Sequence, residues 1–516
     1  MATTHGPVRV EDIDWRSAFP FVNLFRCFRL AIHPPRLLIC LALVILHFLY
    51  GGLLDQAFGP RVHPGDIKAG VGEADGVVRV QAELERIMAS MPVTYRPGAD
   101  DGLATRLVHA VRVIEKEHED ERAALEAAGD ETGDGSVELA RLWLVRQRRL
   151  GQVAALQPRG VFQAALEFKV DALRRMATAL MPASGAADEA DAAPHPCFFE
   201  AAGDLCWRLP CWLACRHPGW LLLWMLGSGV LWAWLGGTAG RMVAVAATLQ
   251  QALPVGSAMT FAKRKFVWLL LAPLVPIIGI GLVWLAMAVV GLVFNVYALD
   301  IVGAILFPLA LAGGFVVVLL LVGLAGGGAL LIPAICVEGS EAFDALTRVY
   351  NYALRPWRLL LYYGVAIVHG AATLAFVSLI VLGTIVVTRA FAGTFVFTSA
   401  SNAPVDLFHA MVPPIGWDAL DDRVDWSALG FTSTVAASII RFWILLLLAV
   451  PGAYAVSYAL SACTWIYLLL RRVADGTDFE DVFDEGVPPG EVFGTPAPEG
   501  APAASEGASE TSAGEA

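Results

Sequence analysis

The chain has 516 residues, of which 57% are hydrophobic and 16% are charged, and its mean hydropathy is +0.61. In soluble globular domains about a quarter of the residues are charged, so this composition argues against a soluble protein and indicates a bilayer as the solvent. The formal net charge is -12, and a nucleic-acid role has no support because no basic surface is implied.

Six apolar runs are long enough to cross a bilayer, which takes about 20 helical residues. They begin near Leu37, Trp220, Phe266, Ile301, Leu359 and Ile439. None of them alternates with the period of two that membrane-barrel strands show. The sequence therefore predicts an all-α fold, a polytopic membrane helical bundle with six spans.

Composition divides the chain into five parts. We predict a cytoplasmic arm with an interfacial helix (1–33), a first transmembrane helix (34–54), an extracytoplasmic helical insert (55–205), a membrane domain with five transmembrane helices (206–472) and a disordered acidic tail (473–516). Arginine and lysine gather in the arm and in the short segments around Arg241, Arg348 and Arg471. By the positive-inside rule these segments and both termini are cytoplasmic, and the first span is an uncleaved anchor.

One short phrase recurs before three of the apolar runs, at 33–38, 217–222 and 355–360, with a weaker copy at 265–270. Each copy follows apolar residues at helical spacing, which is typical of a helix lying in the headgroup plane. Proline ends that helix, and an arginine or tryptophan then anchors the span at headgroup level. The predicted elbow and anchor residues are Pro34, Arg36, Pro218, Trp220, Arg355, Pro356 and Arg358. The alternative is that proline and arginine simply flank membrane helices.

The insert has the composition of a charged, alanine-rich helical domain. Leu103, Leu107 and Ile114 follow helical spacing, and Leu166 and Leu173 are seven residues apart. This pattern predicts a small helical hairpin or bundle.

Four cysteines, Cys197, Cys206, Cys211 and Cys215, crowd the end of the insert. In an oxidising compartment they would form one or two disulfides whose connectivity the sequence leaves open. Interfacial packing of free thiols and a zinc site are the alternatives. The spacing matches no zinc finger or ribbon, so no metal is predicted.

Few polar groups are expected inside the bilayer. His47 and His369 lie within spans, where an ionisable group marks a functional site by default, although a neutral histidine that donates to a neighbouring helix explains both. Pro273, Pro276, Pro451 and Gly452 are candidate helix breaks. Interrupted helices form binding sites in transporters, whereas small residues also allow close helix packing.

Motifs of known catalytic mechanism are absent from the sequence, including H-E-x-x-H, G-x-S-x-G and the P-loop. We therefore predict no catalytic residues, no cofactor and no enzymatic activity.

The stretch "EGSEAFDALTRVYNYALRPWRLLLYY" at 338–363 resembles a motif of uncharacterised bacterial six-helix integral membrane proteins. These are distantly similar to the membrane domain fused to some bacterial glycerophosphodiester phosphodiesterases. The resemblance covers the N-terminal arm and 207–472. It implies a multi-pass protein of the bacterial inner membrane and says nothing about activity; the phosphodiesterase reaction is not implied, because no phosphodiesterase catalytic domain is present in this sequence.

The tail has no lysine or arginine after Arg472, which predicts disorder. Its segment "DFEDVFDEG" at 478–486 interleaves Phe479 and Phe483 with acidic residues, so it either docks in a basic-rimmed groove of a partner or only solubilises the chain.

Besides the lipid bilayer, we expect a protein partner that binds the insert or the tail. The function predicted is that of a non-enzymatic envelope scaffold, assembly or sensory component. The alternative is a transporter or permease for a lipid or small apolar solute.

Overall fold

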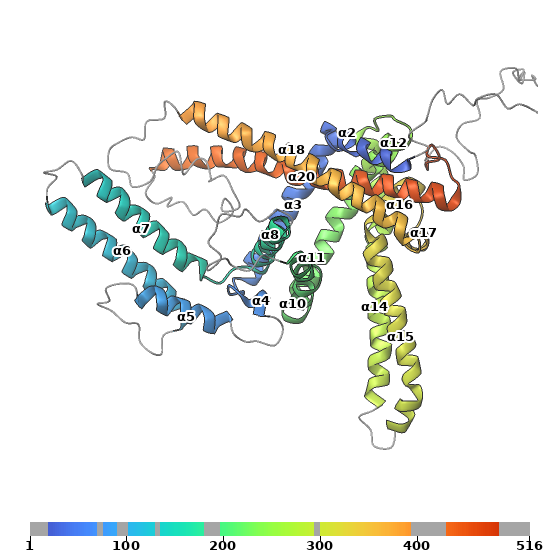
Figure 1. Cartoon of the computed structure of the whole chain (residues 1–516), viewed down its shortest axis with the longest axis horizontal. Helices are drawn as coiled ribbons and strands as arrows, with labels where there is room; N and C mark the ends of the chain where they lie inside the picture. Colours follow the sequence, from blue (N-terminus) through green and yellow to red (C-terminus); the bar gives the residue numbers. More distant parts are fainter. Residues whose placement is uncertain are drawn as a thin grey trace, which may run out of the picture. The chain divides into compact units, whose positions relative to one another are not determined.

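The structure is a computed structural model (Figure 1). It describes residues 19–69, 76–89, 102–128, 135–179, 197–293, 300–393 and 430–483. The N-terminal 18 residues, residues 180–196 of the insert and the tail from residue 484 lie outside the described residues. The chain folds as two compact units, a first unit (1–33, 237–370 and 457–516) and a second unit (34–236 and 371–456).

The prediction of an all-α polytopic bundle is confirmed, because the described residues are helical, form no sheet and include six helices long and apolar enough to span a membrane. These helices are Pro34–Phe58, Pro218–Thr248, Phe266–Leu292, Ile301–Glu338, Pro356–Phe391 and Phe431–Asp475. Many of their large apolar side chains are exposed. A multi-pass membrane protein in a lipid bilayer accounts for that exposure.

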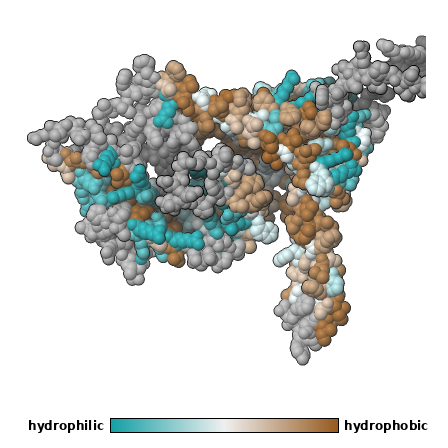
Figure 2. Space-filling view, viewed as in Figure 1, coloured by the Kyte–Doolittle hydropathy of each residue, from teal (hydrophilic) through white to brown (hydrophobic). Residues whose placement is uncertain are grey.

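The first unit contains two terminal helices, a long hairpin and several short helices. Their bounds are η1 Pro20–Arg26, α2 Cys27–Ala31, α12 Gly237–Thr248, α13 Val255–Arg264, α14 Phe266–Val293, α15 Asp300–Gly327, η4 Gly328–Leu330, α16 Leu331–Glu338 and α17 Ala342–Ala353. Helices α14 and α15 lie side by side along their length (Figure 1), and their surface is largely apolar (Figure 2). The start of α18 (Pro356–Gly393) and the end of α20 (Phe431–Asp475) complete this unit.

The second unit contains the insert and the spans on either side of it. Its helices are α3 Pro34–Phe58, α4 Asp66–Ala69, α5 Gly76–Ala89, α6 Leu103–Ala128, α7 Gly135–Ala155, α8 Val161–Ala179, α9 Phe198–Gly203, η2 Asp204–Arg208, α10 Leu209–Arg216, α11 Pro218–Leu231 and η3 Trp232–Gly236. Helices α5, α6 and α7 share a small apolar core that includes Leu84, Leu107 and Ile114, and hydrophilic residues cover α5 and α6 outside (Figure 2). Helix α8 packs instead on α3 and on the start of α11.

All four copies of the recurring phrase lie where one helix ends and the next begins. Pro34, Pro218 and Pro356 are the first residues of α3, α11 and α18, a position where proline needs no hydrogen-bond partner and its fixed φ suits the helix. Proline therefore starts each span as well as ending the preceding helix. The location of these breaks at the membrane surface stays a prediction.

The anchor residues divide into two kinds. Trp357 is 84% exposed and Arg358 is also exposed, as expected of anchors, whereas Arg36 and Trp220 are only 2% and 3% exposed. Trp220 belongs to the apolar core that the insert shares with α11. The anchor interpretation is therefore wrong for these two residues, because protein rather than lipid covers them.

The predicted helix breaks are also wrong. Helix α14 continues through Pro273 and Pro276, and α20 continues through Pro451 and Gly452. Proline is tolerated inside membrane helices because neighbouring groups and small local adjustments satisfy the freed carbonyl.

The tail begins later than predicted. Helix α20 extends to Asp475, and the chain is placed as far as Phe483, so disorder from residue 473 is wrong for residues 473–483.

Candidate functional site

The best-defined polar site lies in the first unit, where α12, α13, α16 and the end of α20 meet. We call it the elbow site and define it as Arg241, Lys265, Glu338, Gly339 and Arg471. Residues 476–483, here named the C-terminal segment, follow the turn at Gly476, whose φ is +71°. The segment returns to this site, and the backbone N–H of Phe483 donates to the carbonyl of Val337 at 2.9 Å.

Two cations hold the end of the C-terminal segment. Arg241, which is 6% exposed, donates to the carbonyl of Cys336 at 2.8 Å and to that of Phe483. Its guanidinium lies 4.6 Å from the centroid of the Phe261 ring. The Lys265 ammonium lies 5.5 Å from the Phe483 ring centroid and donates to the carbonyl of Gly339. The Phe483 ring is therefore held by cation–π contacts as well as by its backbone.

Arg471 joins the C-terminal segment to Glu338. One guanidinium nitrogen donates to the Glu338 carboxylate at 2.8 Å, and the other donates to the carbonyls of Asp478 and Asp481 at 2.9 and 2.6 Å. Tyr467 also donates to Glu338, at 3.0 Å. A buried charge is tolerated only when it is paired and hydrogen-bonded, and Arg471, at 2% exposed, meets both conditions.

The middle of the segment is held by an aromatic contact. The ring of Phe479 lies 5.9 Å from that of Trp465 and 4.6 Å from the guanidinium of Arg472. Both phenylalanines identified in the sequence thus contact a cation, while Asp481 between them meets Arg471.

Gly339 allows this close approach. Its φ is +63°, and a Cβ there would come within 2.5 Å of the Phe483 ring. Only glycine adopts that conformation without strain and leaves room for the ring.

Helix α17 extends the network. Arg348 lies 3.5 Å from the Glu338 carboxylate, and the Tyr352 hydroxyl donates to Asp475. Burial raises the pKa of the Tyr352 hydroxyl, and its hydrogen bond to Asp475 and the charge of that carboxylate raise it further. For Arg348, burial lowers the pKa, but Glu338 and Asp344 outweigh burial and the pKa is raised. Both groups therefore keep their protons at neutral pH.

The described part of the segment identified at 478–486, residues 478–483, binds to the elbow site of its own chain. From the sequence, this segment either docks in a groove of a partner or only solubilises the chain. In the structure, residues 478–483 occupy a basic, aromatic site on the same chain. Residues 484–486 lie outside the described residues. The sequence did not show that Arg241, Lys265, Glu338 and Arg471 would meet.

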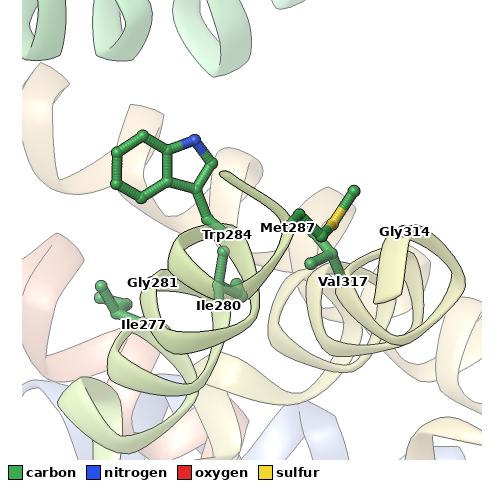
Figure 3. Close-up of a pocket in the computed structure, with 7 residues that line it drawn as sticks. All are labelled: Ile277, Ile280, Gly281, Trp284, Met287, Gly314 and Val317. Carbon is green, nitrogen blue, oxygen red and sulfur yellow. The ribbon is translucent and has the colours of Figure 1, made fainter. Parts of the chain in front are cut away.

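A second feature is an apolar groove of about 530 Å³ between α14 and α15 (Figure 3). It is lined by Ile277, Ile280, Gly281, Trp284, Met287, Gly314 and Val317. Its lining offers almost no polar surface, so the groove suits an apolar occupant. Its lining side chains include no group that would transfer a proton or a chemical group.

The two intramembrane histidines differ. His369 Nδ1 lies 2.9 Å from the Tyr458 hydroxyl, which itself donates to the carbonyl of Ala366. Since the hydroxyl has one proton, His369 donates to it across to α20, as a neutral histidine would. His47 Nδ1, in contrast, is buried without a hydrogen-bond partner among the described residues. Nδ1 therefore does not make the expected bond from His47 to a neighbouring helix, and that bond stays a prediction for the other ring nitrogen.

The four clustered cysteines are free thiols in the structure, with Cys211 half-buried and Cys197, Cys206 and Cys215 exposed. Within the part of the chain that the structure describes, no three His, Cys, Asp or Glu side chains are grouped so that they could hold a metal ion.

Comparison of the chain with family models, with curated proteins and with solved structures found no match. The resemblance of 338–363 to a bacterial membrane-protein family accordingly stays a prediction, and the functional argument depends on the geometry alone.

Proposed function

We propose that this chain is a non-enzymatic scaffold or sensory component of a bacterial inner membrane, whose elbow site binds an acidic, aromatic peptide segment. The observation that supports it is the C-terminal segment bound at that site through its own backbone and through Phe483. By the distribution of positive charge, the site and both termini face the cytoplasm.

The contacts are those of peptide recognition. Arg241 and Arg471 donate to main-chain carbonyls of the segment, which any peptide offers, while the rings of Phe479 and Phe483 fill defined positions. Main-chain bonds that supply affinity and pockets that supply specificity are the usual division of roles in such interfaces. A partner with the same chemistry would compete with the chain's own segment.

The test uses the chain shortened after Gly476 and a labelled synthetic peptide of residues 476–486. The shortened protein should bind the peptide, and the full chain at least about tenfold more weakly, because its site is already occupied. A peptide with both phenylalanines replaced by alanine is the matched control. Absence of binding to a shortened protein that still unfolds cooperatively, or equal binding of the control peptide, would refute the proposal.

The apolar groove between α14 and α15 favours a second candidate function, a transporter or permease for a lipid or small apolar solute. It is tested by labelling single cysteines at Gly279, Gly314 and Gly452 in intact cells with a membrane-impermeant thiol reagent, after accessible native cysteines are replaced. A Cβ at these glycines would lie 3.6, 4.0 and 3.8 Å from its nearest neighbour, which is ordinary van der Waals contact. Labelling at two or more positions supports a water-filled path. Protection at all three, beside a labelled loop control, contradicts transport.

A further inference from the structure

In the second unit, the insert meets the membrane helices around the ring of Trp224. The ring of Trp220 stacks on it at 6.0 Å with an interplanar angle of 10°, and the ring of His47 meets it edge-on at 5.3 Å. The ammonium of Lys169, from α8, lies 5.5 Å from the Trp224 ring centroid. Three helices, α3, α8 and α11, thus bring one cation and three nitrogen-bearing rings together.

This cluster has polar groups without acceptors. The indole N–H groups of Trp220 and Trp224 and Nδ1 of His47 are buried without a hydrogen-bond partner among the described residues. Trp220 as a whole is only 3% exposed. Buried polar groups are hydrogen-bonded in the great majority of cases, and an exception calls for an explanation.

Lys169 is the second and independent observation. It forms no hydrogen bond or ion pair with any residue that the structure describes, and it is partly buried. Burial lowers the pKa of its ammonium, and no carboxylate offsets the effect. Two cations nearby are paired: Arg175 pairs with Asp171 and Asp204, and Lys68 with Asp171.

Two acidic side chains of these helices, Asp55 on α3 and Glu167 on α8, have other partners. Asp55 accepts the backbone N–H groups of Phe162 and Gln163, where it caps the start of α8. Glu167 pairs with Arg159. The protein has thus placed a cation beside two unpartnered indole N–H donors, while Asp55 and Glu167 have other partners, an arrangement complementary to an anion.

The position of the cluster identifies the source of that anion. His47 and Trp224 belong to candidate spans, and Lys169 belongs to the hydrophilic insert. The same helices α3 and α11 expose large leucines on other faces, among them Leu46, Leu53 and Leu226 at 42%, 62% and 54%. A phospholipid would place its phosphate at the donors and its chains along the leucines, whereas a free anion would gain nothing from them.

We propose that His47, Lys169, Trp220 and Trp224 form a binding site for the phosphate of an anionic phospholipid. The lipid would pin the insert helix α8 to the spans α3 and α11 and supply the acceptors that these donors lack. The site lies apart in the chain from the elbow site and does not depend on the function proposed for that site.

The test measures binding of phosphatidylglycerol to the full chain in a non-ionic detergent, by native mass spectrometry and by the shift of the thermal unfolding midpoint. Wild type should bind it at least about tenfold more tightly than phosphatidylcholine. Glycerol phosphate and inorganic phosphate, at the same concentration, should leave the midpoint unchanged. Equal binding of phosphatidylcholine, or equal stabilisation by the soluble phosphates, overturns the assignment to an anionic lipid.

Variants assign the site. Lys169→Gln should weaken phosphatidylglycerol binding at least about tenfold, and Lys169→Arg should restore it to within about threefold. Lys68→Gln, which removes a paired lysine of the insert, is the matched control and should change binding less than twofold. Trp224→Phe keeps a six-membered aromatic ring and removes the N–H group together with the five-membered ring of the indole, and it should weaken binding about threefold without loss of fold. Binding by Lys169→Gln equal to that of wild type refutes the proposal.

Discussion

Two cations, the buried Arg471 in the first unit and the partly buried Lys169 in the second, have opposite surroundings. Arg471 is paired with Glu338 and donates to two main-chain carbonyls of the C-terminal segment. Lys169 meets only an aromatic ring within the described residues. A compensated buried charge belongs to the internal structure of a protein, whereas an uncompensated one disfavours the folded state until a ligand supplies the counter-charge. Arg471 therefore marks a site that the chain's own C-terminal segment occupies, and Lys169 marks a site for a ligand.

The largest expected effect is at Arg471. Arg471→Gln leaves the Glu338 carboxylate without its closest cation and the carbonyls of Asp478 and Asp481 without their donor, so the free energy of unfolding should fall by about 3–5 kcal/mol. Denaturant titration in detergent measures this change. Arg358→Gln, at an exposed arginine near the next elbow, is the control and should change the free energy by less than about 0.5 kcal/mol. Equal effects of the two variants would show that the Glu338 network does not stabilise the unit.

Gly339 gives the next largest effect. Gly339→Ala forces a non-glycine residue to adopt a φ of +63° and moves the Phe483 ring, so we expect a loss of about 1–3 kcal/mol. Gly364→Ala is the control, because a Cβ there meets nothing within 4 Å and alanine favours the helix.

The shortened chain that ends at Gly476 divides the Gly339 effect into two parts. Without Phe483, only the backbone strain remains, and the loss in Gly339→Ala should be smaller than in the full chain. An unchanged loss would mean that the glycine is required by its backbone alone and not by the C-terminal segment.

Local features of this fold were predictable from the sequence. The six spans follow from the length of apolar runs, and the elbows follow from prolines such as Pro34 and Pro356 that begin a helix. Proline also misled the prediction, because Pro276 and Pro451 lie inside continuous helices. Sequence alone does not show whether neighbouring groups satisfy the carbonyl that proline leaves free.

Neither candidate site was predictable in the same way. Arg241 and Arg471 were used only as markers of the cytoplasmic side, since 230 positions separate them and no spacing rule relates them to Glu338. The acidic, aromatic composition of 478–483 was compatible with docking and with a solubilising tail, and it could not name a surface. Lys169 was missed because it sits in an ordinary amphipathic pattern, and only the contacts of α8 with α3 and α11 reveal that its ammonium lacks a partner.

The hydroxyl of Tyr352 offers a smaller effect and a test by pH. Tyr352→Phe removes its bond to Asp475 and should lower the free energy of unfolding at pH 7 by about 1 kcal/mol. Burial, and secondarily Asp475, raises the pKa of this tyrosine in the folded state. The neutral hydroxyl therefore stabilises the fold fully below the ordinary tyrosine pKa of about 10, and this contribution is lost as pH rises above it.

Unfolding measured between pH 8 and 11 should thus show a steeper alkaline loss in wild type than in Tyr352→Phe. A double-mutant cycle with Asp475→Asn separates the hydrogen bond from other effects of the ring. Parallel pH profiles of the two proteins would contradict the assignment of the raised pKa to this pair.

The smallest expected effect is at Lys169, and it completes the comparison. In detergent free of anionic lipid, Lys169→Gln removes a charge with no acceptor among the described residues, so the free energy of unfolding should stay within about 1 kcal/mol of wild type or rise. Because burial lowers the pKa of Lys169 in the folded state, wild type should also lose stability as pH falls through the lysine range, a loss that the glutamine variant lacks.

Adding phosphatidylglycerol should reverse the order of the two proteins. A ligand at 100 times its dissociation constant stabilises the folded state by about 2.7 kcal/mol, and only wild type retains the ammonium that binds it. If Lys169→Gln instead loses as much stability as Arg471→Gln in lipid-free detergent, the ammonium already has an acceptor within the protein. The two cations would then be alike, and the cluster around Trp224 would be a core and not a site.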